Sequence, residues 1–408
     1  MTSNNHSPRI VIIGANFAGL SAASKLANNL NVIVIDSKTH FQWTPNIHEI
    51  LSDVKKADGV RICLHTVFDK LGHTFINGEV SKLSPSSQTI TLNDGCKLQY
   101  DILLIASGHT RENYGVLGAT EYAFGFRSSE EVETIKTRLL ALLSESDKPV
   151  HLNIVGAGYT GIEVAGEILR KYPNNEQLKI NVIDRSQRLL PLLPEKLASD
   201  IQMELNAHKV NLLLEHDIQQ IAQESIYFAD KTLLPSDITI WTAGTSLPEY
   251  LKNTSLSSTH NGIIVKSTLQ TPKYENIFVA GDAASLDQPM AKQASIAMDM
   301  GEHAAININA LCTGLSLTEV RIGPKPVLFT LGDINTYFVY QDLVLASPAL
   351  SAAKEAVYQL YMAKLTAMLP LEQKVSGLFS RLISTEKLIL AEILKCRPRE
   401  ILTRSKLI

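Results

Sequence analysis

The chain begins with hydrophobic runs that are interrupted in a regular way. Residues 10–13 are all Ile or Val, a glycine-containing turn follows, and residues 20–27 are rich in Ala and Leu. A second apolar run covers residues 32–35 and ends in Asp36, 22 residues after Gly14. β-Branched runs without polar interruption are typical of parallel strands that are buried on both faces. The pattern therefore predicts a strand, a helix and a second, parallel strand.

The same pattern returns 142 residues later, at Gly156. Residues 150–155 and 180–183 predict two strands, residues 162–171 predict the helix between them, and Asp184 follows the second strand. This period is too long for a solenoid, so it indicates two separate nucleotide-binding domains.

The two turns carry the glycine spacing of a dinucleotide fingerprint. The second turn is complete, whereas the first has Asn16 in place of the middle glycine. The first glycine permits the tight turn, and the last lets helix and strand pack closely. Free N–H groups of the helix would face a pyrophosphate, and the terminal Asp would accept hydrogen bonds from a ribose. Asn tolerates positive φ better than most residues, so we expect the first turn to survive.

Other segments continue the alternation of helices and strands. A loop to Pro45 should lead into a short helix, and residues 60–100 alternate apolar and polar positions between turn signals, which predicts an antiparallel meander. We also expect a helix and short strands within residues 195–245, strands within residues 100–108, 238–244 and 274–284, and helices at residues 130–143 and 291–311.

Composition narrows the class of protein. A chain of 408 residues with 45% hydrophobic and 19% charged residues has room for two or three domains, and its net charge of −3 gives no indication of nucleic acid as a partner. The four cysteines lie far apart, which disfavours a disulfide framework and fits a reducing compartment. Neither a signal peptide nor a membrane-spanning run is evident. We expect a cytoplasmic protein, with peripheral attachment to the inner face of a membrane as an option.

A third turn makes the cofactor assignment specific. Gly281 and Asp282 follow a predicted strand, where the ribityl chain of a flavin needs a carboxylate. Two complete strand–turn–helix–strand units together with this turn predict FAD on the first unit and a nicotinamide dinucleotide on the second. The expected fold class is α/β, with two Rossmann-like domains and a C-terminal part of helices and strands.

Several segments resemble a known family. Residues 41–51, residues 113–124 and the stretch V-G-A-G-Y-T-G-I-E-V-A-G-E at residues 155–167 are similar to motifs of type II NADH dehydrogenases. The layout of residues 8–345 also resembles the ferroptosis-suppressor and AIF-like NAD(P)H:quinone reductases. The resemblance implies FAD, NADH as electron donor and a quinone as acceptor.

The resemblance also implies roles for particular residues. Glu163 matches a carboxylate that lies near flavin and nicotinamide, where it would steer the nicotinamide or relay a proton; the alternative is a carboxylate stabilised at a helix N-terminus. Lys292 could stabilise negative charge on a reduced flavin, or it could be a solvated lysine at the start of a helix. The predicted cofactor-binding residues are Gly14, Asn16, Gly19, Asp36, Thr44, Pro45, Val80, Ala106, Gly108, Gly156, Gly158, Gly161, Asp184, Gly244, Gly281 and Asp282.

The sequence departs from the family at its quinone-site helix. Ser295 and Asp299 stand where the family pattern has two glutamines. This difference puts the usual quinone pose in question and leaves room for another small electron acceptor.

The choice of electron donor depends on the end of the second nucleotide unit. Asp184 would bind the 2′-hydroxyl of NADH and repel the 2′-phosphate of NADPH. Arg185 and Arg188 are close in sequence and could offset this repulsion. NADH is the predicted donor, and NADPH is the alternative.

The remaining candidate histidines and cysteines are expected to have structural roles. His40, His48 and His109 lie near predicted cofactor loops but lack metal-ligand spacing, so we expect packing roles and no metal site. Cys63 and Cys312 are expected to be buried and inert.

From residue 348 the chain is predicted to be helical and basic. Residues 350–408 contain ten Lys or Arg and five Glu, and apolar residues between positions 371 and 383 fall on one helical face. Such helices could rest on a membrane surface, pack on the FAD domain, or form a homodimer.

These observations predict an FAD-dependent oxidoreductase that passes a hydride from NADH to flavin and two electrons to a quinone-type acceptor. One alternative is a ferredoxin or rubredoxin reductase; another is an AIF-like NADH sensor with slow turnover. The expected domains are FAD-binding (residues 1–121 and 244–325), NAD(P)H-binding (122–243) and C-terminal (326–408).

Overall fold

The computed structural model describes residues 7–145, 147–288, 290–366 and 406–407. Its central feature is a five-stranded parallel sheet in the order β21-β9-β1-β2-β5. In β1, Ile10 pairs with Val32 on one side and with Ile102 on the other. The strands are β1 (Arg9–Ile13), β2 (Asn31–Asp36), β5 (Thr74–Asn77), β9 (Ile102–Ile105) and β21 (Ile277–Val279).

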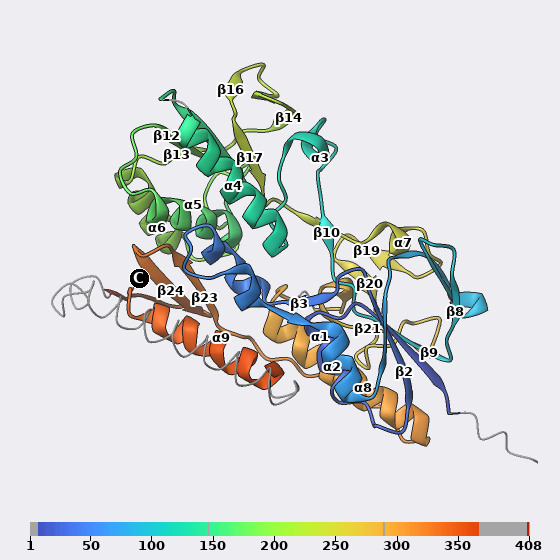
Figure 1. Cartoon of the computed structure of the whole chain (residues 1–408). Coiled ribbons are helices and arrows are strands. Elements are labelled where there is room, and N and C mark those ends of the chain that lie inside the picture. Colours follow the sequence, from blue (N-terminus) through green and yellow to red (C-terminus); the bar gives the residue numbers. More distant parts are fainter. Residues whose placement is uncertain (1–6, 146, 289, 367–405, 408) are drawn as a thin grey trace, which may run out of the picture.

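Helix α1 (Phe17–Ala23) follows β1 and packs on α8 (Ala294–Thr313), so segments almost 300 residues apart in sequence form one layer beside the sheet (Figure 1). Both helices begin beside glycine-rich turns. α1 starts directly after Asn16, and α8 starts shortly after the 3₁₀ turn η4 (Gly281–Ala283). This packing therefore brings the predicted flavin turns together.

A second parallel sheet lies in the upper, green part of Figure 1, in the order β13-β12-β11-β17. Its strands are β11 (Val150–Val155), β12 (Leu178–Ile183), β13 (Asn211–Leu213) and β17 (Ile238–Trp241), and the helices of this part are α4 (Ser129–Glu145), α5 (Tyr159–Lys171) and α6 (Glu195–Ala207). The short strands β10 (Thr110–Arg111) and β18 (Thr245–Ser246) pair between the two sheets.

The predicted meander is only partly present. Strands β6 (Val80–Ser84), β7 (Thr89–Leu92) and β8 (Lys97–Gln99) form an antiparallel sheet. The prediction for residues 60–77 is wrong, because this part contains α2 (Leu64–Leu71) and a strand of the parallel sheet. Leu64, Val67 and Phe68 are buried, which is helical spacing within a stretch that also alternates.

The remaining short elements connect these layers. β3 (His40–Gln42) pairs with β4 (Arg61–Cys63), and the 3₁₀ helices η1 (Thr44–Ile50) and η2 (Ala57–Val60) lie between them. The others are η3 (Pro85–Ser87), α3 (Ala119–Tyr122), β14 (Ile218–Ala222), β15 (Ser225–Phe228), β16 (Leu233–Pro235), α7 (Glu249–Lys252), β19 (Ser258–Thr259), β20 (Gly262–Ile264) and β22 (Ala284–Ser285).

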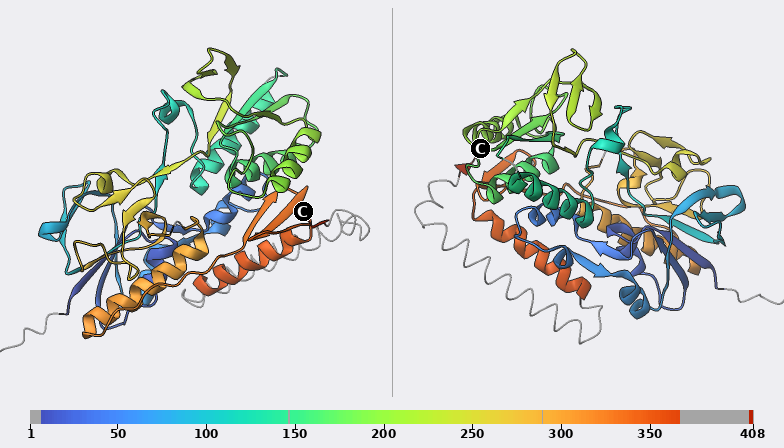
Figure 2. Two further views of the ribbon diagram at one scale, coloured as in Figure 1. Left: turned by 180° about the vertical axis from the view of Figure 1, so that it is seen from behind. Right: turned by 45° about the horizontal axis from the view of Figure 1, so that its top comes forward.

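The C-terminal part packs against both nucleotide units. It contains β23 (Val327–Leu331), β24 (Asn335–Tyr340), β25 (Leu343–Ala346), β26 (Lys406–Leu407) and α9 (Leu350–Thr366). β23 contacts α5, and α9 lies along the outside of this sheet in both views of Figure 2. The predicted amphipathic helix at residues 371–383 lies outside the described residues. Among those that are described, no helix is long and apolar enough to cross a bilayer.

Candidate active site

The two dinucleotide turns have the same geometry. Gly14 and Gly156 have φ values of +100° and +110°, which L side chains rarely adopt. Asp36 Oδ2 accepts a hydrogen bond from the Ala15 amide at 2.6 Å, and Asp184 Oδ2 accepts one from Ala157 at 2.7 Å. Each carboxylate therefore closes its own turn as well as facing a nucleotide cavity.

The middle position of each turn does not need a left-handed residue. Asn16 has φ −89° and Gly158 has φ −82°, so the expectation that Asn16 survives through its tolerance of positive φ is wrong. A Cβ atom on Gly158 would meet no atom within 4 Å. A side chain fits this position in the protein alone, and a glycine is needed only where a ligand approaches.

The first turn opens into a cavity of about 580 Å³. Predicted residues that line it include Asn16, Thr44, Pro45, Ala106, Gly108, Glu163, Gly281, Asp282 and Lys292. Asp36, with Asn16 and Thr44, lines a small neighbouring cavity. Two buried polar atoms in the main cavity, Asn16 Oδ1 and His109 Nδ1, have no hydrogen-bond partner. Such orphaned atoms and a glycine-rich cradle fit a large polar cofactor such as FAD.

Four predicted residues, Gly14, Gly19, Gly161 and Val80, line none of the nucleotide cavities. A Cβ on Gly19 would come within 1.7 Å of the Gly14 carbonyl oxygen, so the close approach of helix α1 to the turn requires glycine at this position. Gly161 has the same role beneath Gly156. Val80 is buried at the start of β6 and lines none of the cavities described above.

The second turn opens into a cavity of about 660 Å³ lined by Gly156, Gly158, Asp184 and Gly244. Tyr159, the first residue of α5, lines this cavity and also the first one. The two nucleotide cavities therefore meet at one aromatic side chain.

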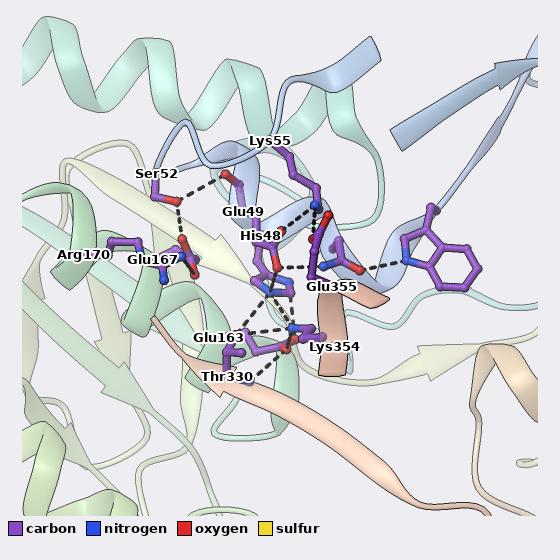
Figure 3. A network of polar contacts seen from close by, with 12 residues as sticks. His48, Glu49, Ser52, Lys55, Glu163, Glu167, Arg170, Thr330, Lys354 and Glu355 are labelled. Atoms are coloured by element: carbon purple, nitrogen blue, oxygen red, sulfur yellow. Dashed lines mark hydrogen bonds and ion pairs between the residues drawn. The ribbon is translucent and has the colours of Figure 1, made fainter. Parts of the chain in front are cut away.

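Glu163 lies one turn further along α5, inside a buried polar cluster (Figure 3). Its Oε1 is 2.6 Å from Lys354 Nζ of α9, and its Oε2 is 3.5 Å from His48 Nδ1 of η1. The Thr330 amide also donates to Oε1, at 3.3 Å. Glu163 lies beyond the first helical turn, so contacts from three other segments, rather than the helix terminus, define its surroundings.

Burial determines the charges in this cluster. It raises the pKa of Glu163, although the Lys354 ammonium opposes the shift. Burial and Lys354 together hold the pKa of His48 well below its usual value. A neutral His48 can accept a hydrogen bond from Lys354 through Nε2, at 2.9 Å, and turn its Nδ1–H towards Glu163. The prediction that His48 has only a packing role is therefore incomplete, because His48 also takes part in this polar cluster.

The cluster continues away from the cavity. Lys55 pairs with Glu355 at 2.6 Å and with Glu49 at 3.4 Å. Ser52 donates a hydrogen bond to Glu167, and burial raises the pKa of Glu167 to about 7. Residues from η1, the following turn, α5 and α9 are thus joined by charge as well as by packing (Figure 3).

Lys292 also lines the first cavity. Its Nζ is 3.1 Å from His109 Nε2 and 3.2 Å from Thr245 Oγ1, so it is not a freely solvated lysine. Burial, Lys292 and Arg127 lower the pKa of His109 to about 4. His109 is therefore neutral near pH 7 and can accept from Lys292. Asp282 faces the same cavity, and burial raises its pKa.

Sequence reasoning missed Lys354, Arg127 and Tyr159. Arg127 donates to the His109 carbonyl at 2.7 Å, and both residues line the flavin cavity. No local motif surrounds Lys354 or Arg127. Tyr159 lies within the second glycine turn, so its place in that motif was the one available signal.

The two residues of α8 that differ from the family's quinone-site pattern have different surroundings in the structure. Ser295 lines the flavin cavity, whereas Asp299 is paired with Lys325 at 2.6 Å. The cavity is also lined by Val327, Leu328, Val357 and Tyr361 of the C-terminal part. The lining of the cavity thus includes apolar side chains of the C-terminal part, whereas Asp299 and Lys325 do not line it.

The fold and these cavities define a class of flavoprotein. Its members have two Rossmann-like units, each with a dinucleotide site at a glycine-containing turn. Residues 8–301 match the family model described as pyridine nucleotide-disulphide oxidoreductase, and the chain belongs to this family. The predicted α/β fold is confirmed.

Relatives are named for quinone reduction. The chain is 26% identical to demethylphylloquinone reductase of Synechocystis, over 86% of this chain and 91% of the relative. It is 23% identical to a type II NADH:quinone oxidoreductase of Staphylococcus aureus, over 79% and 87%. Among solved structures, NDH2 from Plasmodium falciparum in complex with NADH superposes with a TM-score of 0.82 at 15% identity, covering 94% and 98%. The predicted resemblance to type II NADH dehydrogenases is confirmed.

The family name refers to disulphide chemistry, for which the described residues offer no paired cysteines. Cys63 and Cys312 are half-buried rather than buried, and Cys96 is exposed. Within the same described part, no group of three or more His, Cys, Asp or Glu residues could hold a metal ion.

Proposed function

We propose that the chain is an FAD-dependent NADH:quinone oxidoreductase. The observation that carries the proposal is that the two nucleotide cavities meet at Tyr159, while apolar side chains of the C-terminal part also line the first cavity. A nicotinamide bound on the second turn can reach this junction, and a hydrophobic acceptor can bind against the apolar side chains. When bound, FAD accepts a hydride from NADH and returns two electrons to the acceptor.

The residues of the chain would hold the reactants and move protons. Asn16, Gly281 and Asp282 would hold FAD, and Gly158 and Asp184 would hold the nicotinamide nucleotide. Reduction of a quinone by NADH to a quinol and NAD⁺ consumes one proton from solution. Glu163, paired with Lys354 inside the cavity wall, is suited to deliver a proton to the acceptor. Lys292, held by His109 and Thr245, would place positive charge beside the cofactor.

NADH is the proposed donor, because Asp184 faces the cavity with a carboxylate that would repel a 2′-phosphate. We place the protein at a cytoplasmic membrane face. An exposed apolar stripe on α9, formed by Ala353, Ala356, Val357 and Leu360, supports this location. A homodimer is an alternative use of this stripe.

The function is tested with purified, FAD-loaded protein. Anaerobic NADH should bleach the flavin absorbance, and a short-chain quinone should restore it within one mixing experiment. A two-iron ferredoxin should restore it far more slowly. Fast transfer to ferredoxin, or a reduced flavin that persists in the presence of quinone, would favour the reductase or the sensor alternative.

Glu163→Gln provides the residue-level test. We expect reoxidation by quinone to slow by at least about tenfold, because a general acid contributes 10²–10⁴-fold. Reduction by NADH should change much less. Glu176→Gln, on an exposed carboxylate paired with Lys209, is the matched control and should behave as the parent protein. Equal loss in both half-reactions would assign Glu163 to nicotinamide positioning.

A further inference from the structure

The choice between NADH and NADPH involves a second residue besides Asp184. Arg185 follows Asp184 at the end of β12, and its guanidinium is stacked on the ring of Tyr114, 4.8 Å from the ring centroid. Both side chains line the cavity of the second glycine turn. Among the described residues that line it, Arg185 is the one Lys or Arg. A 2′-phosphate in this cavity would need this guanidinium as its partner.

The neighbouring arginine is already engaged. Arg188 Nη1 donates to the Leu190 carbonyl at 3.2 Å, and Nη2 donates to the Pro191 carbonyl at 2.7 Å. These bonds shape the loop at the cavity rim. Arg188 is therefore engaged with its own loop, and Arg185 is the arginine in the cavity lining that could offset Asp184.

The loop that carries Tyr114 is anchored by hydrogen bonds, while Tyr114 itself is 51% exposed. Its backbone has φ +51°, an unusual conformation for a non-glycine residue, and its amide donates to Glu112 Oε1 at 2.9 Å. The Glu112 carbonyl accepts from Trp241 Nε1 at 2.9 Å, which anchors this loop to β17. The ring also occupies the space beside Gly244, where a Cβ would lie 2.3–2.5 Å from it.

We propose that Tyr114 is a specificity-determining residue that keeps Arg185 away from the nucleotide 2′-position. A guanidinium stacks well on an aromatic face, and the stack must be broken before Arg185 can pair with a 2′-phosphate. Asp184 is thereby left unopposed beside the ribose. The inference rests on the proposed binding of a nicotinamide nucleotide in this cavity.

The test separates binding from turnover. ADP-ribose and 2′-phospho-ADP-ribose contain the discriminating end of each dinucleotide but no nicotinamide, and calorimetry gives their Kd values on the full, FAD-loaded chain. The parent protein should prefer ADP-ribose. Tyr114→Leu should reduce this preference by about two- to fivefold, the range expected for one exposed cation–π contact. Tyr114→Phe keeps the aromatic face and should leave the preference unchanged.

Further variants test whether the change in preference depends on the contact between Tyr114 and Arg185. Once Arg185→Ala is present, Tyr114→Leu should not change the preference further. Arg185→Lys keeps the charge but stacks less well, so it should shift the preference in the same direction as Tyr114→Leu even if the latter folds poorly. Tyr227→Leu, on an exposed tyrosine away from the cavity, should have no effect.

Two results overturn the inference without touching the proposed function. They are an unchanged preference in both Tyr114→Leu and Arg185→Lys, and a parent protein that favours the 2′-phosphate. If the parent binds neither probe, the proposed function of the cavity fails together with the inference.

Discussion

Asn16 is the residue at which the two nucleotide turns differ. It occupies the backbone position of Gly158, yet its Oδ1 is buried and lacks a partner. An oxygen acceptor of this kind needs a hydroxyl or an N–H group opposite it, whereas a phosphate oxygen would need the Nδ2 amide. The side chain is thus suited to two different groups of the same cofactor.

We expect Asn16→Gly to weaken FAD binding by about three- to tenfold, because one hydrogen bond contributes 0.5–1.5 kcal/mol. Flavin release during dialysis, followed by fluorescence, gives the Kd. Asn29→Gly, on an exposed turn, is the control. An unchanged Kd for Asn16→Gly would mean that Asn16 is merely accommodated.

Glu167 provides a pH-dependent prediction. Its carboxyl is buried, and its pKa is raised from 4.5 to about 7. Below pH 4.5 the group is neutral in the folded and unfolded states alike. Between pH 4.5 and 7 only the unfolded state loses its proton, so the stability from this group falls as the pH rises.

Glu167→Gln removes this titration and keeps the shape of the side chain. The variant should match the parent protein near pH 4.5 and exceed it in stability by up to about 3 kcal/mol above pH 7. Apparent Tm measured across pH 4.5–8 with saturating FAD checks this trend. A Tm difference that is independent of pH would show that Glu167 titrates normally.

At the scale of elements, α1 and α8 approach closely because Gly301 has no side chain. A Cβ at this position would lie 2.1 Å from the Ala18 carbonyl oxygen. Ala18 belongs to the first turn of α1, two residues after Asn16. The distance between these helices therefore sets the shape of the flavin cradle.

Gly301→Ala should push the helices apart, lower stability by about 1–3 kcal/mol and weaken FAD binding. Apparent Tm and the FAD Kd measure the two effects. Gly323→Ala adds the same methyl group where a Cβ meets nothing within 4 Å, and it should be silent. A silent Gly301→Ala would show that α8 moves without disturbing the cradle.

The elements that could be predicted from the sequence are those with a strict local pattern. The strand at residues 150–155 matches β11, and both glycine turns were located, because continuous apolar runs and turn glycines are local signals. The cluster around Glu163 could not be predicted, since Lys354 meets Glu163 across 191 residues. Helix α2 was missed because its spacing also fits an alternating strand.

At the scale of the whole molecule, the apolar stripe of α9 is exposed to solvent, and the exposed fraction of Leu360 is 70%. We expect Leu360→Glu to reduce co-sedimentation with anionic vesicles several-fold, because a charge opposes insertion into the interface. Transfer to a soluble quinone should be unchanged. Leu140→Glu, on exposed α4, is the control. Equal sedimentation of both variants would mean that α9 does not contact the membrane.

The contacts of α9 also determine when the active site can be completed. Lys354 and Glu355 reach back to Glu163 and Lys55, and these partners are 191 and 300 residues earlier in the chain. During synthesis, both nucleotide-binding units leave the ribosome before α9 exists, and domains fold in that order. Until α9 docks, Glu163 lacks Lys354, Lys55 lacks Glu355, and the flavin cavity lacks the part of its lining that α9 supplies. A nascent chain should therefore acquire tight flavin binding only after its last described helix has emerged.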